Sequence, residues 1–363
     1  MGLPSGWVGL KFRADGAAGP VYAFTVFFHD DHVFIGGKEY PIGQCCVDMA
    51  NLDESVLKGI DQRVWKFIPA AQALLTEKTD SAAALAQEKL NAVWDIVFSL
   101  PVYRDLKMDE ACNYHAFQRL MADKEKWAQV QDPGSEGYAM YQRMMVGLAC
   151  FTDDLRRFRQ QVTVMAERYF EPLKLRNSGA YADAYSQFYA QMLLIGAQVF
   201  HEDFDQSFPV EVNFVPMMHR TEKDTMFIAE KATFTSLTNF LRTEFYRGLA
   251  KGTAPRRCHN CGRYFLLPAG YNACYCNNIA PGETERTCRK VGAHRKEAQG
   301  KANRTPAQKE YGRTYNRLKV RKQRGKISKD EWNTAVAKAQ ELVARSERGE
   351  LTDEELKNKL AEL

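Results

Sequence analysis

The stretch Cys258-His-Asn-Cys261-Gly-Arg-Tyr-Phe265 decides the architecture of the C-terminal part of this chain, and Cys274, Cys276 and Cys288 follow it. Two cysteines separated by two residues form a turn that brings both thiolates to one metal ion. Gly262 suits the tight backbone directly after that turn. Because the chain has nine cysteines and no secretory signal, this spacing favours metal ligands over disulfides. We therefore predict a bound Zn²⁺ ion and a cytoplasmic protein.

Five cysteines compete for the four positions of a tetrahedral zinc site. We select four of them as ligands: Cys258, Cys261, Cys276 and Cys288. Cys274 is the spare, although Cys274 and Cys276 are expected on one face of a short strand and could exchange roles. His259 lies inside the turn, and His294 is a weaker candidate for the last ligand. Four thiolates leave no open position for water, so the predicted zinc is structural.

The residues around the cysteines predict a treble-clef-like finger. Residues 264–266 are expected to form one short strand, and Tyr275 with its flanking cysteines a second. Cys288 then opens a basic helix. A turn with two ligands, a hairpin and a ligand at the start of a helix together make up that layout.

From Phe234 to Gly292, the strings CHNCGRYF, YC and TCRKVGA resemble a group of uncharacterised bacterial proteins that carry a C-terminal zinc-binding domain of unknown function. The segment is also distantly similar to the CGNR-type zinc fingers of bacterial transcription regulators. The string Thr287-Cys288-Arg289-Lys290 stands where those fingers have CGNR. The resemblance covers about the last third of the chain. It implies zinc and the same four cysteine ligands, and it implies no reaction.

Positive charge is concentrated directly after the cysteines. Residues 286–329 hold 16 Lys or Arg against Glu297 and Glu310, a local charge of +14, which leaves −9 for the rest of a chain whose net charge is +5. Such asymmetry is typical of a basic arm that meets phosphate. We predict a zinc-containing protein that binds nucleic acid, DNA or RNA, and acts as a regulator or as a factor associated with mobile elements or defence. The predicted contacts are Arg289, Lys290, Arg295, Lys309, Arg313, Arg317, Arg321, Lys322 and Arg324, with Tyr311 and Tyr315 stacking on bases.

Two other functions remain open from the sequence. The chain could be a protein-interaction scaffold whose basic arm binds an acidic partner. It could also be a divalent-metal nuclease whose acids are far apart in sequence. No phosphate-binding Gly-rich loop, nucleophile elbow or His-Glu-x-x-His string is present, so an enzyme is the less favoured prediction.

Patterns of apolar residues predict a mainly α (α+β) protein. Phe24, Val26 and Phe28 alternate within a hairpin over 21–37, with the turn at 29–32. From about 52 to 206, apolar residues recur at helical spacing, with breaks that indicate about five helices. No apolar run is long enough for a membrane span, so no membrane partner is expected. The predicted regions are 1–50 (N-terminal β-hairpin), 51–207 (helical bundle), 208–254 (short strands and connecting helix), 255–300 (zinc finger) and 301–363 (basic and C-terminal helices).

Overall fold

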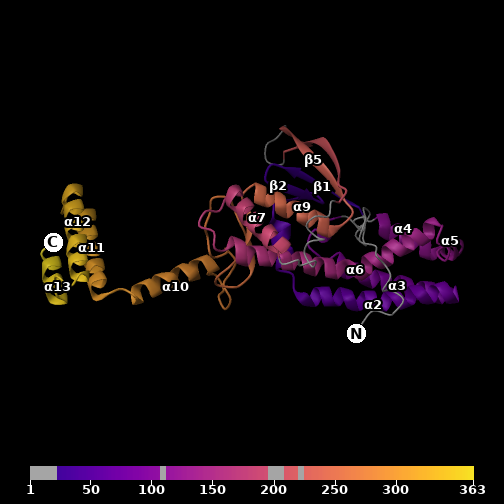
Figure 1. Cartoon of the computed structure of the whole chain (residues 1–363), viewed down its shortest axis with the longest axis horizontal. Helices are drawn as coiled ribbons and strands as arrows, with labels where there is room; N and C mark the ends of the chain where they lie inside the picture. Colours follow the sequence, from indigo (N-terminus) through magenta and orange to yellow (C-terminus); the bar gives the residue numbers. More distant parts are fainter. Residues whose placement is uncertain (1–22, 107–111, 195–207, 220–224) are drawn as a thin grey trace. The chain divides into compact units, whose positions relative to one another are not determined.

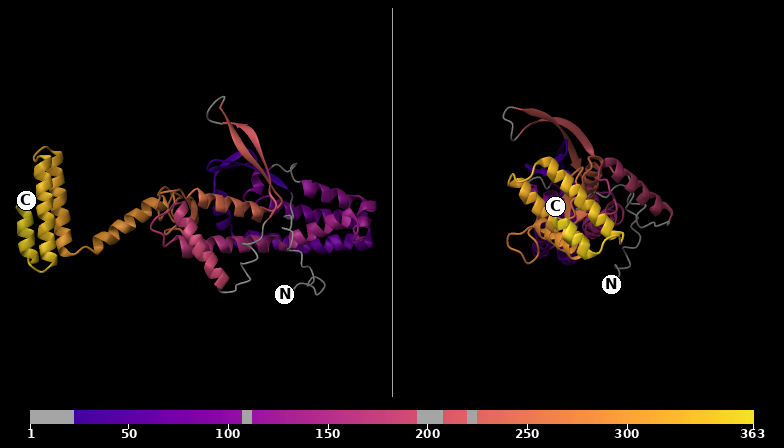
Figure 2. Two further views of the ribbon diagram at one scale, coloured as in Figure 1. Left: turned by 45° about the horizontal axis from the view of Figure 1, so that its top comes forward. Right: turned by 90° about the vertical axis from the view of Figure 1, so that its left-hand side faces the viewer.

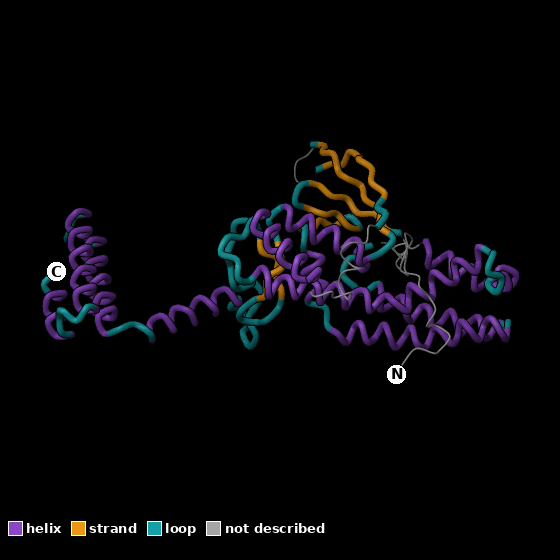
Figure 3. Tube along the Cα trace, in the orientation of Figure 1, coloured by secondary structure: helices purple, strands orange, loops and turns teal. Residues whose placement is uncertain are grey.

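The computed structural model describes residues 23–106, 112–194, 208–219 and 225–363 of the 363-residue chain. The fold is mainly helical with a small antiparallel sheet, as the sequence predicted (Figure 1). Helix predominates in both parts of the chain, and the strands of the first part form two separate sheets (Figure 3). Contacts divide the chain into two compact units, Met1–Cys276 and Asn277–Leu363. Each unit is described by itself.

The first unit contains a five-stranded antiparallel sheet of order β3-β2-β1-β5-β4. Its strands are β1 (Phe24–His29), β2 (His32–Ile35), β3 (Lys38–Pro41), β4 (Glu211–Met218) and β5 (Met226–Phe234). The predicted N-terminal hairpin is confirmed, because His29 pairs with His32 across the expected turn. Tyr22, assigned to the same hairpin, lies outside the described residues. Residues 220–224, whose polar character predicts a turn between the two short strands of the 208–254 region, also lie outside them.

The described part of residues 52–206 holds six α-helices where the sequence pattern indicated about five, because the chain also breaks at Asp123, which caps α5 (Lys124–Gln129). Asp53, Thr79, Ser135 and Ser236 each cap a helix, since each side chain accepts a hydrogen bond from a backbone N–H of the first turn. A 3₁₀ turn at Tyr103–Asp105 and a π-helical segment at Met165–Phe170 complete this part. The α-helices are α1 (Gln44–Ala50), α2 (Glu54–Glu77), α3 (Asp80–Val97), α4 (Cys112–Ala122), α5 (Lys124–Gln129), α6 (Glu136–Val164), α7 (Ser178–Leu194) and α9 (Leu237–Ala250).

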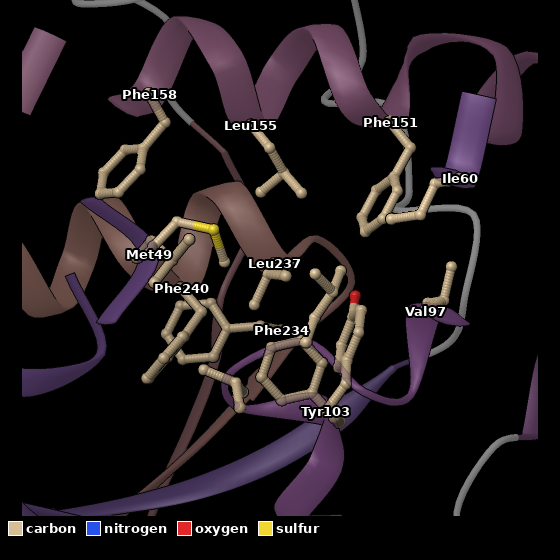
Figure 4. Close-up of a cluster of buried hydrophobic side chains, with 14 of the residues drawn as sticks. Met49, Ile60, Val97, Tyr103, Phe151, Leu155, Phe158, Phe234, Leu237 and Phe240 are labelled. Atoms are coloured by element: carbon tan, nitrogen blue, oxygen red, sulfur yellow. The ribbon is translucent and has the colours of Figure 1, made fainter. Parts of the chain in front are cut away.

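The core of the first unit lies between the sheet and the helices. Leu237 and Phe240 on α9 pack toward Phe234 of β5 and Tyr103, while Phe151 and Leu155 approach from α6 (Figure 4). The rings of Phe24 and Phe240 meet edge to face with their centroids 5.8 Å apart. Edge-to-face contacts of this kind add to the stabilisation that burial of the rings already provides.

The β4–β5 hairpin leaves an apolar face exposed. It extends beyond the other strands of the sheet (Figure 2). Phe214, Met218, Met226 and Ile228 are all exposed, and the strand register places them on one face. Nearer β1, the same face carries Glu230, which forms a bidentate ion pair with Arg247 of α9. The apolar part of this face is therefore not covered by the described residues.

The second unit, Asn277–Leu363, begins with a loop and continues as helices from the last cysteine onward. They are α10 (Cys288–Ala302), α11 (Pro306–Gln323), α12 (Lys329–Glu347) and α13 (Asp353–Ala361). Ser328 with Glu331 and Thr352 with Glu355 form the capping boxes of α12 and α13, as their Ser/Thr-x-x-Glu spacing in the sequence predicts. A small core joins α11, α12 and α13 through Ala307, Ala339, Leu342, Leu356 and Leu360. Among the described residues, no helix combines the length and apolar character that a bilayer span requires.

Candidate metal centre and basic surface

The Cys-x-x-Cys turn lies at the tip of a two-stranded hairpin. Strands β6 (Ala254–Arg257) and β7 (Tyr264–Leu267) pair in antiparallel register, with Arg257 opposite Tyr264. Cys258 N donates to Arg263 O at 2.8 Å, and Gly262 N donates to Cys258 O at 2.9 Å. Gly262 has φ = 74°, a left-handed conformation that glycine adopts without steric cost. The local turn chemistry thus agrees with the sequence prediction.

The predicted strand around Tyr275 is wrong. The partner of β7 is β6, which precedes the cysteine turn, and residues 271–278 form bends and irregular loop. Pro255 hid this strand from the sequence pattern, because proline cannot donate to a strand ladder and usually indicates a strand edge or no strand. Gly252, with φ = 82°, turns the chain out of α9 directly into β6.

Four cysteines converge on one point. The sulfur atoms of Cys258, Cys261, Cys276 and Cys288 all lie within 4.8 Å of one another. The Sγ atoms of Cys261 and Cys276 are 3.7 Å apart, far longer than a disulfide bond of about 2.05 Å. A tetrahedral site with metal–sulfur bonds of about 2.3 Å has sulfur–sulfur edges of about 3.8 Å. The cluster therefore fits a metal ion, and these are the four ligands that the sequence selected.

The loop before Cys288 fixes the position of the fourth cysteine. Ile279 and Thr287 form an antiparallel bridge, and Cys288 N donates to Asn278 O at 2.8 Å. The Thr287 hydroxyl then accepts from Lys290 N at 3.3 Å, which caps the start of α10. Cys288 opens a helix, as predicted, and its side chain is buried.

The thiol of Cys258 lies among backbone donors. Burial raises the pKa of Cys258, but backbone N–H groups of Cys261, Cys276 and Asn260 outweigh it and lower that pKa to about 7. One of these donors, Cys276 N, is 3.4 Å from the Cys258 sulfur. Hydrogen bonds to a thiolate stabilise its charge, and the thiolate is the form that binds metal.

Cys274 is held outside the four-cysteine cluster. Its sulfur is 3.4 Å from Nη2 of Arg256, and its carbonyl oxygen accepts from His259 N at 3.0 Å. Contacts with Arg256 and with the His259 backbone therefore hold Cys274 away from the cluster, whereas Cys276 is part of it. Neither histidine joins the four sulfur atoms: His259 Nε2 lies 2.8 Å from Glu171 Oε1, and His294 is exposed on α10.

An ionic network with two buried arginines braces the cysteine turn, and no pattern in the sequence predicts it. The side chain of Arg256 is 5% exposed and binds Glu171 bidentately at 2.9 and 3.1 Å. Arg176, 3% exposed, donates to Glu171 O at 2.9 Å and shares Asn272 Oδ1 with Arg256. Desolvation raises the pKa of Glu171, but the bonds from Arg256 and His259 prevail and lower it below its ordinary value.

Further contacts hold β7 against the body of the first unit. The side-chain amide of Asn51, at the end of α1, donates to Tyr264 O and accepts from Tyr264 N, both at 2.8 Å. The Tyr264 hydroxyl donates to Glu167 in the π-helical segment. Cys258 and Cys261 are thus carried by a hairpin whose second strand is anchored to the body of the first unit.

The predicted nucleic-acid contacts on α10 are exposed. Arg289, Lys290 and Arg295 lie on this helix, and every residue from Ala293 to Gln299 is exposed. Beyond its first turn, α10 therefore has no buried side among these residues. A helix without a buried side gains no stability from packing and must be stabilised by its ends or by a partner.

Most predicted contacts on α11 have partners within the second unit. Arg317 Nη2 donates to Leu360 O at 2.6 Å, and Arg321 Nη1 donates to Leu363 O at 3.0 Å. Arg313 pairs with Glu310, and the ammonium of Lys322 lies 4.1 Å from the centroid of the Trp332 ring. Lys309 and Arg324 are exposed.

The two tyrosines of α11 contact α12. The Tyr311 hydroxyl accepts from Gln340 Nε2 at 3.3 Å, and the Tyr315 ring meets Trp332 edge to face at 5.9 Å. Tyr311 and Tyr315 are half-buried in these positions. Their packing stabilises the bundle and reduces the ring area that a base could stack on.

One family model matches residues 205–363, and its description reads family of unknown function (DUF6076). The match includes the cysteine cluster, the basic helices and the Phe234–Gly292 segment that carries the resemblance. The description names no activity and no metal. No curated protein and no solved structure matches the chain.

Proposed function

We propose that the C-terminal region binds nucleic acid through the phosphate backbone, and that the four cysteines hold a structural zinc ion. The observation that carries the first part is the large, exposed excess of positive charge over negative charge. Residues 286–329 hold a charge of +14, and the cations of α10 point to solvent. Surface charge of this density attracts polyanions and raises their rate of association.

Zinc is the metal that best fits four cysteine thiolates. Thiolate ligands favour zinc and iron–sulfur centres over magnesium, calcium and manganese, which prefer oxygen ligands. With Cys258, Cys261, Cys276 and Cys288 as ligands, a tetrahedral ion has no position for substrate or water. The ion would supply folding energy to the β6–β7 turn and to the start of α10, and no catalytic chemistry.

Fluorescence anisotropy tests the nucleic-acid proposal. The purified zinc-containing protein is titrated into labelled DNA and RNA at low salt, and the titration is repeated at increasing salt. We expect affinity to fall steeply as salt rises, because bound cations release counterions from the phosphates. Only weak binding to both DNA and RNA at low salt, with dissociation constants of about 1 μM or more, would reject the proposal.

A further inference from the structure

Helix α10 carries positive charge on several sides of its axis. Successive residues of an α-helix are about 100° apart. Arg289 and Lys296 therefore share one side, while Lys290 and Arg295 lie about a third of a turn to either side of it. A helix that only crosses a phosphate backbone needs cations on one side. Cations on several sides suit a helix that lies between two rows of phosphates.

The dimensions of α10 suit the major groove of B-form DNA. An α-helix with its side chains is about 10–12 Å across, and the major groove is about 12 Å wide. Small residues, Gly292, Ala293 and Ala298, keep α10 slender between its cations. In double-stranded RNA the major groove is deep and narrow, and a helix cannot enter it.

The aromatic residues needed for single strands are engaged elsewhere. Proteins that bind single strands stack bases on exposed aromatic rings. The tyrosines of α11 pack against α12 through Gln340 and Trp332, and α10 contains no Phe, Tyr or Trp. The basic region therefore offers phosphate contacts and little stacking surface.

We propose that the nucleic acid bound by this region is double-stranded DNA, and that α10 is the helix that enters its major groove. This inference rests on the nucleic-acid proposal above and adds the ligand and the element. It assigns the main phosphate contacts to Arg289, Lys290, Arg295 and Lys296. We expect α11 to make fewer phosphate contacts, because Arg317 and Arg321 already donate hydrogen bonds to the backbone oxygens of Leu360 and Leu363.

The first test compares ligands on the full-length, zinc-containing protein. Anisotropy titrations use a DNA duplex of about two helical turns, each of its single strands, and a double-stranded RNA of the same sequence. We expect the DNA duplex to bind at least about tenfold more tightly than the other ligands. Equal or tighter binding of single strands or of RNA would overturn the inference and leave the nucleic-acid proposal standing. Binding to none of them would overturn the proposed function itself.

The second test locates the groove and the helix. Guanine N7 lies in the major groove, so dimethyl sulfate footprinting of the native complex should show protected guanines. A variant with Lys290→Gln, Arg295→Gln and Lys296→Gln should lose at least about tenfold in duplex affinity and have a salt dependence shallower by about two to three phosphate contacts. Its matched control removes three exposed cations of the second unit: Lys309→Gln, Lys319→Gln and Arg324→Gln. Unprotected guanines, or an equal loss in the control, would overturn the assignment to α10.

Discussion

Single side chains decide which cysteines can meet one metal ion. Cys274 and Cys276 are two residues apart, yet only the sulfur of Cys276 lies in the four-sulfur cluster. Arg256 contacts the sulfur of Cys274, and Arg256 is itself fixed by Glu171. The choice between the two cysteines therefore depends on a carboxylate that is distant in sequence.

A cobalt-substituted protein distinguishes the two cysteines. Co²⁺ replaces zinc in thiolate sites, and its visible spectrum reports ligand number and sulfur–metal charge transfer. Cys276→Ser should weaken the charge-transfer band and shift the d–d bands, because one thiolate is lost. Cys274→Ser is the matched control, and its spectrum should equal that of the unmodified protein. The reverse pattern would show that Cys274 is the ligand.

The Glu171 carboxylate makes stability depend on pH. Its folded-state pKa is lowered, so the stability that it contributes is present above the ordinary carboxyl pKa of about 4.3 and is lost as pH falls through the folded-state pKa. Glu171→Gln leaves Arg256 buried without its carboxylate and should cost about 3 kcal/mol near neutral pH.

Urea unfolding of both proteins across this range measures the effect. We expect the stability difference to be largest near neutral pH and to shrink below about pH 4. Glu283→Gln, which breaks an exposed pair with Arg286, is the control and should change stability little. A difference independent of pH would contradict the assigned role of Glu171.

Local elements were largely predictable, because their signals lie within a few residues. The hairpin turn at 29–32, the caps Ser236, Ser328 and Thr352, and the helix that opens at Cys288 all match the sequence prediction. The short helix α1 and strand β6 were missed. Strand β6 contains Pro255, and α1 spans only seven residues, too few to show a helical period.

Chelation tests how the loop before α10 depends on the metal. The bridge between Ile279 and Thr287 closes this loop directly before Cys288, so loss of the metal from Cys288 should loosen it. Trypsin cleavage after Arg286, Arg289 and Lys290 should then accelerate at least about tenfold. A tenfold increase corresponds to a loss of about 1.4 kcal/mol in the free energy that keeps the loop closed, a small part of the binding free energy of a structural zinc ion.

Mass spectrometry of the fragments provides the measurement. Cleavage after Lys338 within α12 is the internal control, because the small core of α11, α12 and α13 involves none of the four cysteines. An equal acceleration at Lys338 would indicate general unfolding. Unchanged cleavage at Arg286 would contradict the role given to the cysteine cluster.

The chain as a whole combines parts that its sequence order does not bring together. Strand β5 pairs with β1 although Phe24 and Phe234 are far apart along the chain. Glu171, Arg176 and Arg256 come from three segments and meet beside the cysteine turn. Patterns of spacing and periodicity report local structure, so neither the sheet order nor the ionic network could be predicted from them.

The proposed zinc site, formed by four cysteines at the start of the basic helix α10, can be tested by metal analysis. The full-length protein is purified without chelators, and its metal content is measured by inductively coupled plasma mass spectrometry. We expect about one zinc ion per chain. A zinc content well below one per chain, with the cysteines reduced, would contradict the proposed site.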